Sequence, residues 1–261
     1  MYFAKKSLGQ NFLVDTNIIR KIVNLTNIFN KDVIEIGPGK GALTEEILNN
    51  KPRSLILVEK DNNLSNNLKF KYKKNNKIKV FNKDILKFNI ENKLKKNSII
   101  FGNLPYNISS QILVKFIKFK NWPPKYSDVI FMFQKELSER ITGKYGTSKY
   151  GRLSIITNYR LKILNKFNIS NNCFFPKPKI ESSVLHFRPN KKIYYKIKKI
   201  ENLEKITNIL FSNKRKMINK NIKKIFKNKD ISLSMNLDLN SRPSNIEPDK
   251  YYKITEYFER S

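Results

Sequence analysis

The chain has 261 residues, of which 39% are hydrophobic and 12% aromatic, and this composition excludes an intrinsically disordered protein. Its net charge of +32 favours a polyanionic partner, nucleic acid before a membrane surface, although AT-rich codon usage would also enrich lysine. One cysteine (Cys173) and one histidine (His186) exclude an intrachain disulfide and a histidine-rich metal site, and we expect no bound metal.

Apolar periodicity predicts helices alternating with strands over the first 190 residues. Residues 15–29 have the spacing of a helix that starts after a capping Asp15. Continuous apolar runs predict buried strands in DVIEI, SLILVE, KIKVF, SIIFGN and SDVIFMF, with further helices over 61–70, 109–119 and 134–141. Strands that are apolar on both faces and alternate with helices indicate an α/β fold with a doubly wound parallel sheet.

The pattern changes after residues 182–190, SSVLHFRPN, which alternate like a strand and make His186 a structural residue. Beyond them, lysine-rich segments have helical periodicity without a convincing strand. We therefore expect a catalytic domain over 1–191 and a small, all-helical domain over 192–261.

The segment EIGPGKGALTEEI predicts a strand, a glycine turn and a helix, an arrangement in which the backbone can approach a ligand closely. Gly37, Gly39 and Ala42 satisfy the dinucleotide-binding pattern. Glu59 ends the second predicted strand, where its carboxylate can accept both hydroxyls of a ribose. Three interpretations stay open: a nicotinamide dinucleotide, S-adenosylmethionine, or a tight turn with a structural role alone.

Asp84 follows the third predicted strand, at the same sheet edge as Glu59. Its carboxylate can accept from the exocyclic amine of a bound adenine. It can equally cap a short helix that follows, and the residue alone does not choose between these roles.

Residues 102–107, GNLPYN, combine an amide, a proline and an aromatic ring at the end of the fourth predicted strand. Pro105 holds the preceding residue extended, which directs the Leu104 carbonyl outward beside the side-chain carbonyl of Asn103. Two neighbouring acceptors match the two hydrogens of an exocyclic amine, and the Tyr106 ring can stack on the attached base. Such acceptors stabilise the positive charge that develops when the amine attacks a methyl sulfonium. A strand-ending turn, the alternative, explains only the proline.

Six motifs follow one another along the chain: KKSLGQNFLVD (5–15), EIGPGKGALT, GNLPYNISS, FMFQKE (131–136), YGRLS (150–154) and FFPKPKIESSV (174–184). In this order they resemble the motifs of the ribosomal RNA adenine dimethyltransferases, most closely the bacterial enzymes of the small subunit. The resemblance implies a Rossmann-like methyltransferase sheet with a small C-terminal helical domain. It also implies S-adenosylmethionine as the cofactor.

The resemblance implies cofactor contacts for individual residues. Asn11 and Leu13 would help to enclose S-adenosylmethionine, and Gly37 would lie under its methionine part. Glu59 would hold the ribose and Asp84 the adenine amine.

The same resemblance implies the catalytic residues. Asn103 would contact both cofactor and target. Phe174 would stack on the target adenine opposite Tyr106, with Phe175 as the alternative one position away.

The basic segment 211–226 resembles the family's C-terminal RNA-contacting helix. Lys214, Arg215 and Lys216 are the predicted phosphate contacts, although in so basic a chain they would also fit a solvated face. An enzyme that modifies a base needs that base unpaired or extruded. The implied partner is small-subunit rRNA, free or within an immature small ribosomal subunit.

The implied activity is N6,N6-dimethylation of two adjacent adenines near the 3′ end of 16S-type rRNA, with a role in small-subunit biogenesis. The alternatives are a large-subunit (23S) methyltransferase of the macrolide-resistance type, a mainly non-catalytic ribosome assembly factor, and a nicotinamide oxidoreductase. No apolar run reaches the roughly 18 residues of a membrane span, and the first residues lack a signal-peptide core. We expect a cytoplasmic monomer without a membrane partner.

Overall fold

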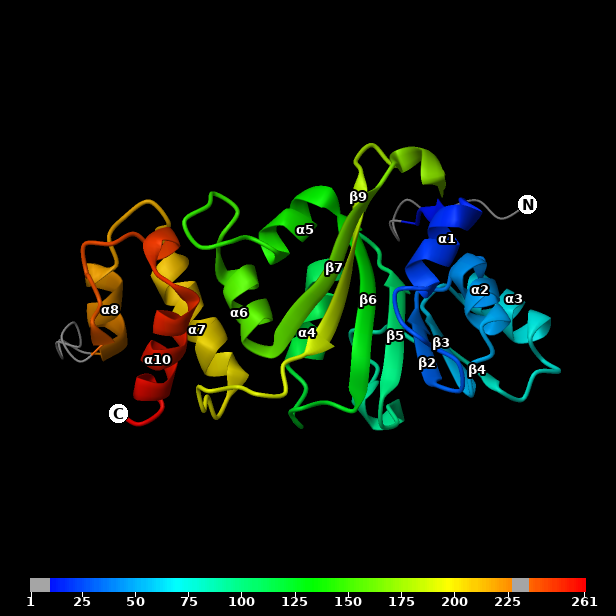
Figure 1. Cartoon of the computed structure of the whole chain (residues 1–261), viewed down its shortest axis with the longest axis horizontal. Helices are drawn as coiled ribbons and strands as arrows, with labels where there is room; N and C mark the ends of the chain where they lie inside the picture. The colour runs from blue at the N-terminus through cyan, green and yellow to red at the C-terminus, as the bar shows by residue number, and fades with distance from the viewer. Residues whose placement is uncertain (1–9, 227–234) are drawn as a thin grey trace. The chain divides into compact units, whose positions relative to one another are not determined.

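The computed structural model describes residues 10–226 and 235–261, so the first five residues of the KKSLGQNFLVD motif lie outside the described part. The chain divides into two compact units, each described by itself below. The first contains the described residues up to Ser138 together with Ile163–Pro189, and the second contains Glu139–Lys162 and Asn190–Ser261. Figure 1 labels the main helices and strands of both.

The first unit is built on a seven-stranded sheet with the order β4-β3-β2-β5-β6-β9-β7. Its strands are β2 (Asp32–Ile36), β3 (Ser54–Glu59), β4 (Ile78–Asn82), β5 (Ser98–Asn103), β6 (Tyr126–Gln134), β7 (Leu161–Ile169) and β9 (Ser182–Pro189). Strands β2 to β6 pair in parallel, which confirms the five predicted strands and the α/β fold class. The strand order reverses between β2 and β5.

The sheet is mixed rather than wholly parallel, because β9 pairs antiparallel with β6. The edge strand β7 was not predicted from the sequence. Most of its side chains are exposed or half-buried, so its residues LKILNKFNI lack the continuous apolar run of the central strands.

Five helices belong to the elements around this sheet: α1 (Thr16–Val23), α2 (Ala42–Asn49), α3 (Asn62–Lys71), α4 (Ser109–Ile117) and α5 (Lys135–Ile141). Asp15 caps α1 as predicted, accepting the Ile18 N–H at 3.0 Å. The predicted helix over 15–29 is too long, because α1 ends at Val23 and polar residues such as Asn24 follow.

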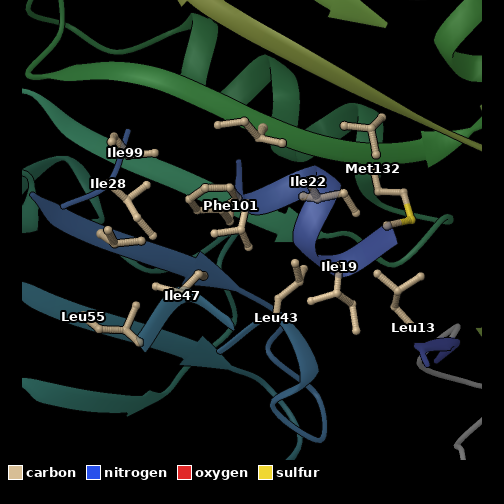
Figure 2. Close-up of a cluster of buried hydrophobic side chains, with 14 of the residues drawn as sticks. Leu13, Ile19, Ile22, Ile28, Leu43, Ile47, Leu55, Ile99, Phe101 and Met132 are labelled. Atoms are coloured by element: carbon tan, nitrogen blue, oxygen red, sulfur yellow. The ribbon is translucent and has the colours of Figure 1, made fainter. Parts of the chain in front are cut away.

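Helices cover both faces of the sheet. On one face, α1 and α2 pack on the central strands, and Figure 2 shows Ile22 and Ile47 near Phe101 in this cluster. On the other face, α4 contributes Phe116, whose ring lies 5.4 Å from that of Phe131 in β6. The sheet is thus buried on both sides, as its apolar strands require.

A second, two-stranded sheet joins the start of the described chain to the FFPKPK segment. Strand β1 (Phe12–Leu13) pairs antiparallel with β8 (Phe174–Phe175). The register places Phe12 opposite Phe175 and Leu13 opposite Phe174.

The second unit is helical. It contains α6 (Arg152–Arg160), α7 (Ile200–Phe211), α8 (Asn219–Phe226), α10 (Pro248–Phe258) and the short 3-10 helix η4 (Pro243–Asn245). The 3-10 helices η2 (Glu91–Lys93) and η3 (Asn171–Cys173) belong to the first unit. None of the helices in the described part of the chain combines the length and apolar character needed to cross a bilayer.

The segment 139–162 lies in the helical unit, although the sequence placed it in the first domain. The reason is tertiary: the Tyr252 hydroxyl donates to the Ile155 carbonyl at 3.0 Å, and the Tyr150 hydroxyl donates to the Ile246 carbonyl at 3.0 Å. The last crossing between the units, after Pro189, lies close to the predicted boundary.

Candidate active site

The glycine turn and the GNLPYN segment meet at the carboxyl edge of the sheet. Strands β2 and β5 are parallel neighbours, with Ile36 opposite Gly102 in the register, so the segments that follow them lie side by side. Ligands of open α/β sheets bind where the strand order reverses, which here is between β2 and β5. A pocket at this edge is lined by all six residues predicted to bind the cofactor: Asn11, Leu13, Gly37, Glu59, Asp84 and Asn103. Leu104, Pro105 and Tyr106 line the same pocket.

The glycine turn needs glycine for two separate reasons. Gly37 and Gly39 have positive φ angles of 66° and 59°, which disfavour any residue with a Cβ. A Cβ at Gly39 would also lie 2.9 Å from the Phe12 ring, and one at Gly37 would lie 3.4 Å from the Asn103 carbonyl oxygen. The backbone therefore forms part of the pocket wall.

A buried carboxyl that the sequence reasoning missed holds this turn in place. Glu35 is buried in β2 and accepts from the Thr44 hydroxyl of α2 at 2.6 Å, which joins the strand before the turn to the helix after it. Burial raises the pKa of Glu35 to about 8. An acidic residue between apolar neighbours, in the run Val33–Ile36, was the available signal.

Glu59 ends β3 and is buried at the pocket wall. One carboxylate oxygen accepts the Gly39 N–H at 3.1 Å, and the other accepts the Asp61 N–H at 2.9 Å. Burial raises the pKa of Glu59 in spite of these hydrogen bonds. Each carboxylate oxygen keeps a further lone pair, so the ribose contact of Glu59 stays a prediction that this geometry permits.

Asp84 follows β4, where it opens a turn and lines the pocket, while its contact with an adenine amine stays a prediction. Its carboxylate forms a 2.9 Å ion pair with Lys60 and accepts the Leu86 N–H at 2.9 Å. The hydrogen bond from Lys60 lowers the pKa of Asp84. Its backbone carbonyl accepts from Lys87 and Phe88, so the residue opens a tight turn while it lines the pocket.

Asn103 is oriented by the segment that precedes β1. Its side-chain Nδ2 donates to the Asn11 carbonyl at 3.0 Å, which leaves Oδ1 as a hydrogen-bond acceptor. Leu104 next to it is buried, and a Cβ at Gly102 would lie only 2.6 Å from Leu104 Cδ2. The glycine before Asn103 is therefore required by packing.

Tyr106 is anchored by a residue to which the sequence reasoning assigned no role. Its hydroxyl lies 2.6 Å from Oγ of Ser182, which begins β9 and is buried. Burial raises the pKa of Tyr106, so the phenol is protonated at neutral pH. Ser182 belongs to the FFPKPKIESSV motif, but nothing local in that motif indicates a bond to a residue 76 positions earlier.

The β1–β8 ladder separates Phe174 from Phe175. Because successive side chains of a strand point to opposite faces, Leu13 and Phe174 pack into the core together, while Phe175 points outward. Phe174 is 3% exposed and Phe175 is 65% exposed. The stacking role of Phe174 stays a prediction, and it requires the Phe174 ring to leave this packing.

The three predicted phosphate contacts lie in a turn rather than in a helix. Helix α7 ends at Phe211 and α8 begins at Asn219, so the predicted helix over 211–226 is wrong. Serine and asparagine at 212–213 favour helix ends, because their side chains compete for backbone hydrogen bonds. Lys214, Arg215 and Lys216 are all exposed in this turn.

Lys214 differs from its two neighbours. Its ammonium donates to the Ser148 and Tyr150 carbonyls at 2.9 and 3.2 Å, within the helical unit. The ammonium therefore has a structural partner already.

Comparison with known proteins identifies similar sequences and structures. A family model described as ribosomal RNA adenine dimethylase matches residues 1–260. Ribosomal RNA small subunit methyltransferase A of Pelagibacter ubique is 46% identical over 257 residues, covering 98% of this chain and 97% of the relative. The protein of the same name from Malacoplasma penetrans is 39% identical over 261 residues, covering 97% and 91%.

Two solved structures have the same fold. A dimethyladenosine transferase from Plasmodium falciparum superimposes with a TM-score of 0.79 at 24% identity, covering 95% of this chain and 98% of the other. The 23S rRNA methyltransferase ErmE superimposes with a TM-score of 0.69 at 21% identity, covering 95% and 99%. At these identities the likeness concerns the fold, and it confirms the Rossmann-like methyltransferase architecture.

Proposed function

The chain belongs to the ribosomal RNA adenine dimethylase family, and we propose that it transfers methyl groups from S-adenosylmethionine to N6 of two adjacent adenines near the 3′ end of small-subunit rRNA. Relatives 39–46% identical over nearly the whole chain are named as small-subunit rRNA methyltransferases. One observation carries the proposal for the site: the glycine turn and the Asn103–Tyr106 segment line a single pocket.

The residues of the pocket fit a cationic nucleoside. S-adenosylmethionine, when bound, supplies an electrophilic methyl group on a sulfonium. Glu59 would accept from the ribose hydroxyls and Asp84 from the adenine amine, from the ends of neighbouring strands. The bare backbone at Gly37 would leave room for the methionine part, while Asn11 and Leu13 would close the pocket over it.

In this mechanism the protein binds the N6 amine of the target adenine and does not deprotonate it before the attack on the methyl group. The Asn103 side-chain carbonyl and the Leu104 carbonyl would accept the two N6 hydrogens of the target adenine, which stabilises the positive charge that develops on nitrogen. The bond from Asn103 to Asn11 keeps the acceptor oriented before the substrate arrives. Tyr106, anchored on Ser182, would stack on the base, and Phe174 would follow from the other side.

We assign rRNA binding to the helical domain over 192–261. Within its turn after α7, Arg215 and Lys216 would make the main phosphate contacts, since the Lys214 ammonium is already bonded to two carbonyls. Phosphate contacts position the substrate, whereas the base is recognised in the pocket.

The test is transfer of labelled methyl groups to undermethylated small ribosomal subunits, followed by primer extension across the rRNA. The wild-type chain should modify two adjacent adenines. Asn103→Ala should lower transfer at least 100-fold, the typical cost of a lost transition-state hydrogen bond in an active site, while rRNA binding is retained. The matched double variant Arg215→Ala/Lys216→Ala should do the reverse, with weaker rRNA binding and normal affinity for S-adenosylmethionine.

Two results would contradict these assignments. Methyl transfer by Asn103→Ala near the wild-type rate would exclude the two-acceptor mechanism. Primer-extension stops confined to the large-subunit RNA would exclude the small-subunit substrate.

A further inference from the structure

A hollow beside the candidate active site is lined by an exposed aromatic ring that the proposed reaction does not use. Phe12, Val14, Lys40 and Phe175 are among the residues that line it, and we call it the Phe175 hollow. It shares Phe12 and Lys40 with the wall of the cofactor pocket, so the two are neighbours.

The β1–β8 ladder explains how the ring comes to be exposed. Phe12 and Phe175 are directly opposite each other, and their side chains share the face turned away from the Leu13–Phe174 pair. Phe175 is 65% exposed, and Val14 beside it is 54% exposed. Phe175 and Val14 therefore place apolar surface at the rim of the hollow, where the flat face of a ligand ring can pack.

The charge at the hollow suits a polyanion. The Lys40 ammonium lies 5.0 Å from the centre of the Phe12 ring and belongs to the glycine turn. Glu45 also lines the hollow, but its carboxylate is bonded to Lys71 and to the Tyr72 hydroxyl, both at 2.5 Å. Lys40 therefore supplies positive charge at the hollow, while the carboxylate of Glu45 is already ion-paired with Lys71.

We propose that the Phe175 hollow binds a base of the substrate RNA that flanks the target adenine, stacked on the Phe175 ring with its phosphate near Lys40. The inference rests on the proposed function, since that function supplies the RNA. Aromatic rings stack on any base, so the site needs no particular sequence beside the target. The occupant is a flanking base and not the target, because none of Asn103–Tyr106 lines this hollow.

The test measures binding of the full-length protein to a short RNA with the two adjacent adenines of the small-subunit 3′ end. Phe175→Ala should raise the Kd roughly 5- to 160-fold, which corresponds to the 1–3 kcal/mol of a stacked base. Phe175→Trp should keep the Kd within about threefold, because indole stacks as well as a phenyl ring.

Phe70→Ala is the matched control. Phe70 is 73% exposed and has a lysine ammonium 4.8 Å from its ring, but it lies on α3 outside the hollow. Its replacement should leave the Kd for RNA unchanged. Calorimetry with S-adenosylmethionine shows that each variant is folded.

The position of the base is read with 2-aminopurine, whose fluorescence is quenched on stacking. With the probe in a flanking position, the wild type should quench it and Phe175→Ala should not. If Phe175→Ala instead removed quenching only at the target position, or changed the Kd less than twofold, the proposal would be overturned. These binding measurements do not depend on methyl transfer. A protein that stacked the flanking base but transferred no methyl group would contradict the proposed function and leave this proposal standing.

Discussion

Replacing Glu35 by glutamine should remove a pH-dependent loss of stability that comes from burying this carboxyl. Burial raises the pKa of Glu35 to about 8. The negative charges of Glu59 and Glu45 also act to raise this pKa, whereas the hydrogen bond from Thr44 acts to lower it. The folded protein therefore holds a proton that the unfolded chain releases near pH 4.5. Between these values the free energy of unfolding falls as the pH rises.

The magnitude follows from the two pKa values. Each pH unit between them lowers the stability by about 1.4 kcal/mol, and the slope fades near pH 8, so the loss between pH 6 and pH 8 is about 2 kcal/mol. Glutamine is neutral throughout this range, and its carbonyl can still accept from Thr44. The Glu35→Gln variant should therefore gain about 2 kcal/mol relative to the wild type between pH 6 and pH 8.

Urea unfolding at pH 6, 7 and 8 measures this difference. The single tryptophan, Trp122, lies in the first unit and reports its unfolding by fluorescence. Asp84→Asn is the control: the hydrogen bond from Lys60 lowers the pKa of Asp84, and Asp84 is not among the charges that raise the pKa of Glu35, so this variant should differ from the wild type by a constant amount across the range. A constant difference for Glu35→Gln as well would show that the buried carboxyl is ionised throughout.

Two further predictions concern other buried contacts. Asp128→Asn should lower the free energy of unfolding by about 2 kcal/mol at pH 7. Burial acts to raise the pKa of Asp128, but hydrogen bonds such as that from His186 outweigh it and lower this pKa to about 2. The stabilisation is therefore present above pH 4 and is lost as the pH falls through 2, which urea unfolding at pH 7 and pH 2.5 can check. Ser182→Ala should raise KM for RNA about fivefold by freeing the Tyr106 hydroxyl, whereas Ser183→Ala, whose hydroxyl is bonded elsewhere, should not. In a Tyr106→Phe background Ser182→Ala should add little to KM, and full additivity would show that the two hydroxyls act independently.

Much of the site could be predicted because its determinants are local. Gly37 and Gly39 are required by positive φ angles, and Pro105 restricts the residue before it whatever the rest of the chain does. Carboxylates at the ends of consecutive parallel strands, such as Glu59 and Asp84, reach one sheet edge in any doubly wound fold. These constraints act within a few residues, so they can be predicted from a single sequence.

Of the predictions that failed, one overlooked a local signal and another depended on the tertiary context. The residues at 211–226 have helical periodicity, but their hydrogen bonds break between α7 and α8 at the serine and asparagine of 212–213. The β7 strand is polar because it lies at the edge of the sheet, and the edge position is decided by neighbours rather than by its own pattern.

The sequence by itself determined the α/β fold, the glycine turn and the order of the motifs, because periodicity and backbone restrictions are properties of short segments. The tertiary structure alone decided which distant residues touch. Examples are the hydrogen bond between Tyr106 and Ser182, the burial of Phe174 next to an exposed Phe175, and the packing of the 139–162 segment within the helical unit. Each of these depends on contacts between segments far apart in the chain, and such contacts leave no local pattern from which they could be predicted.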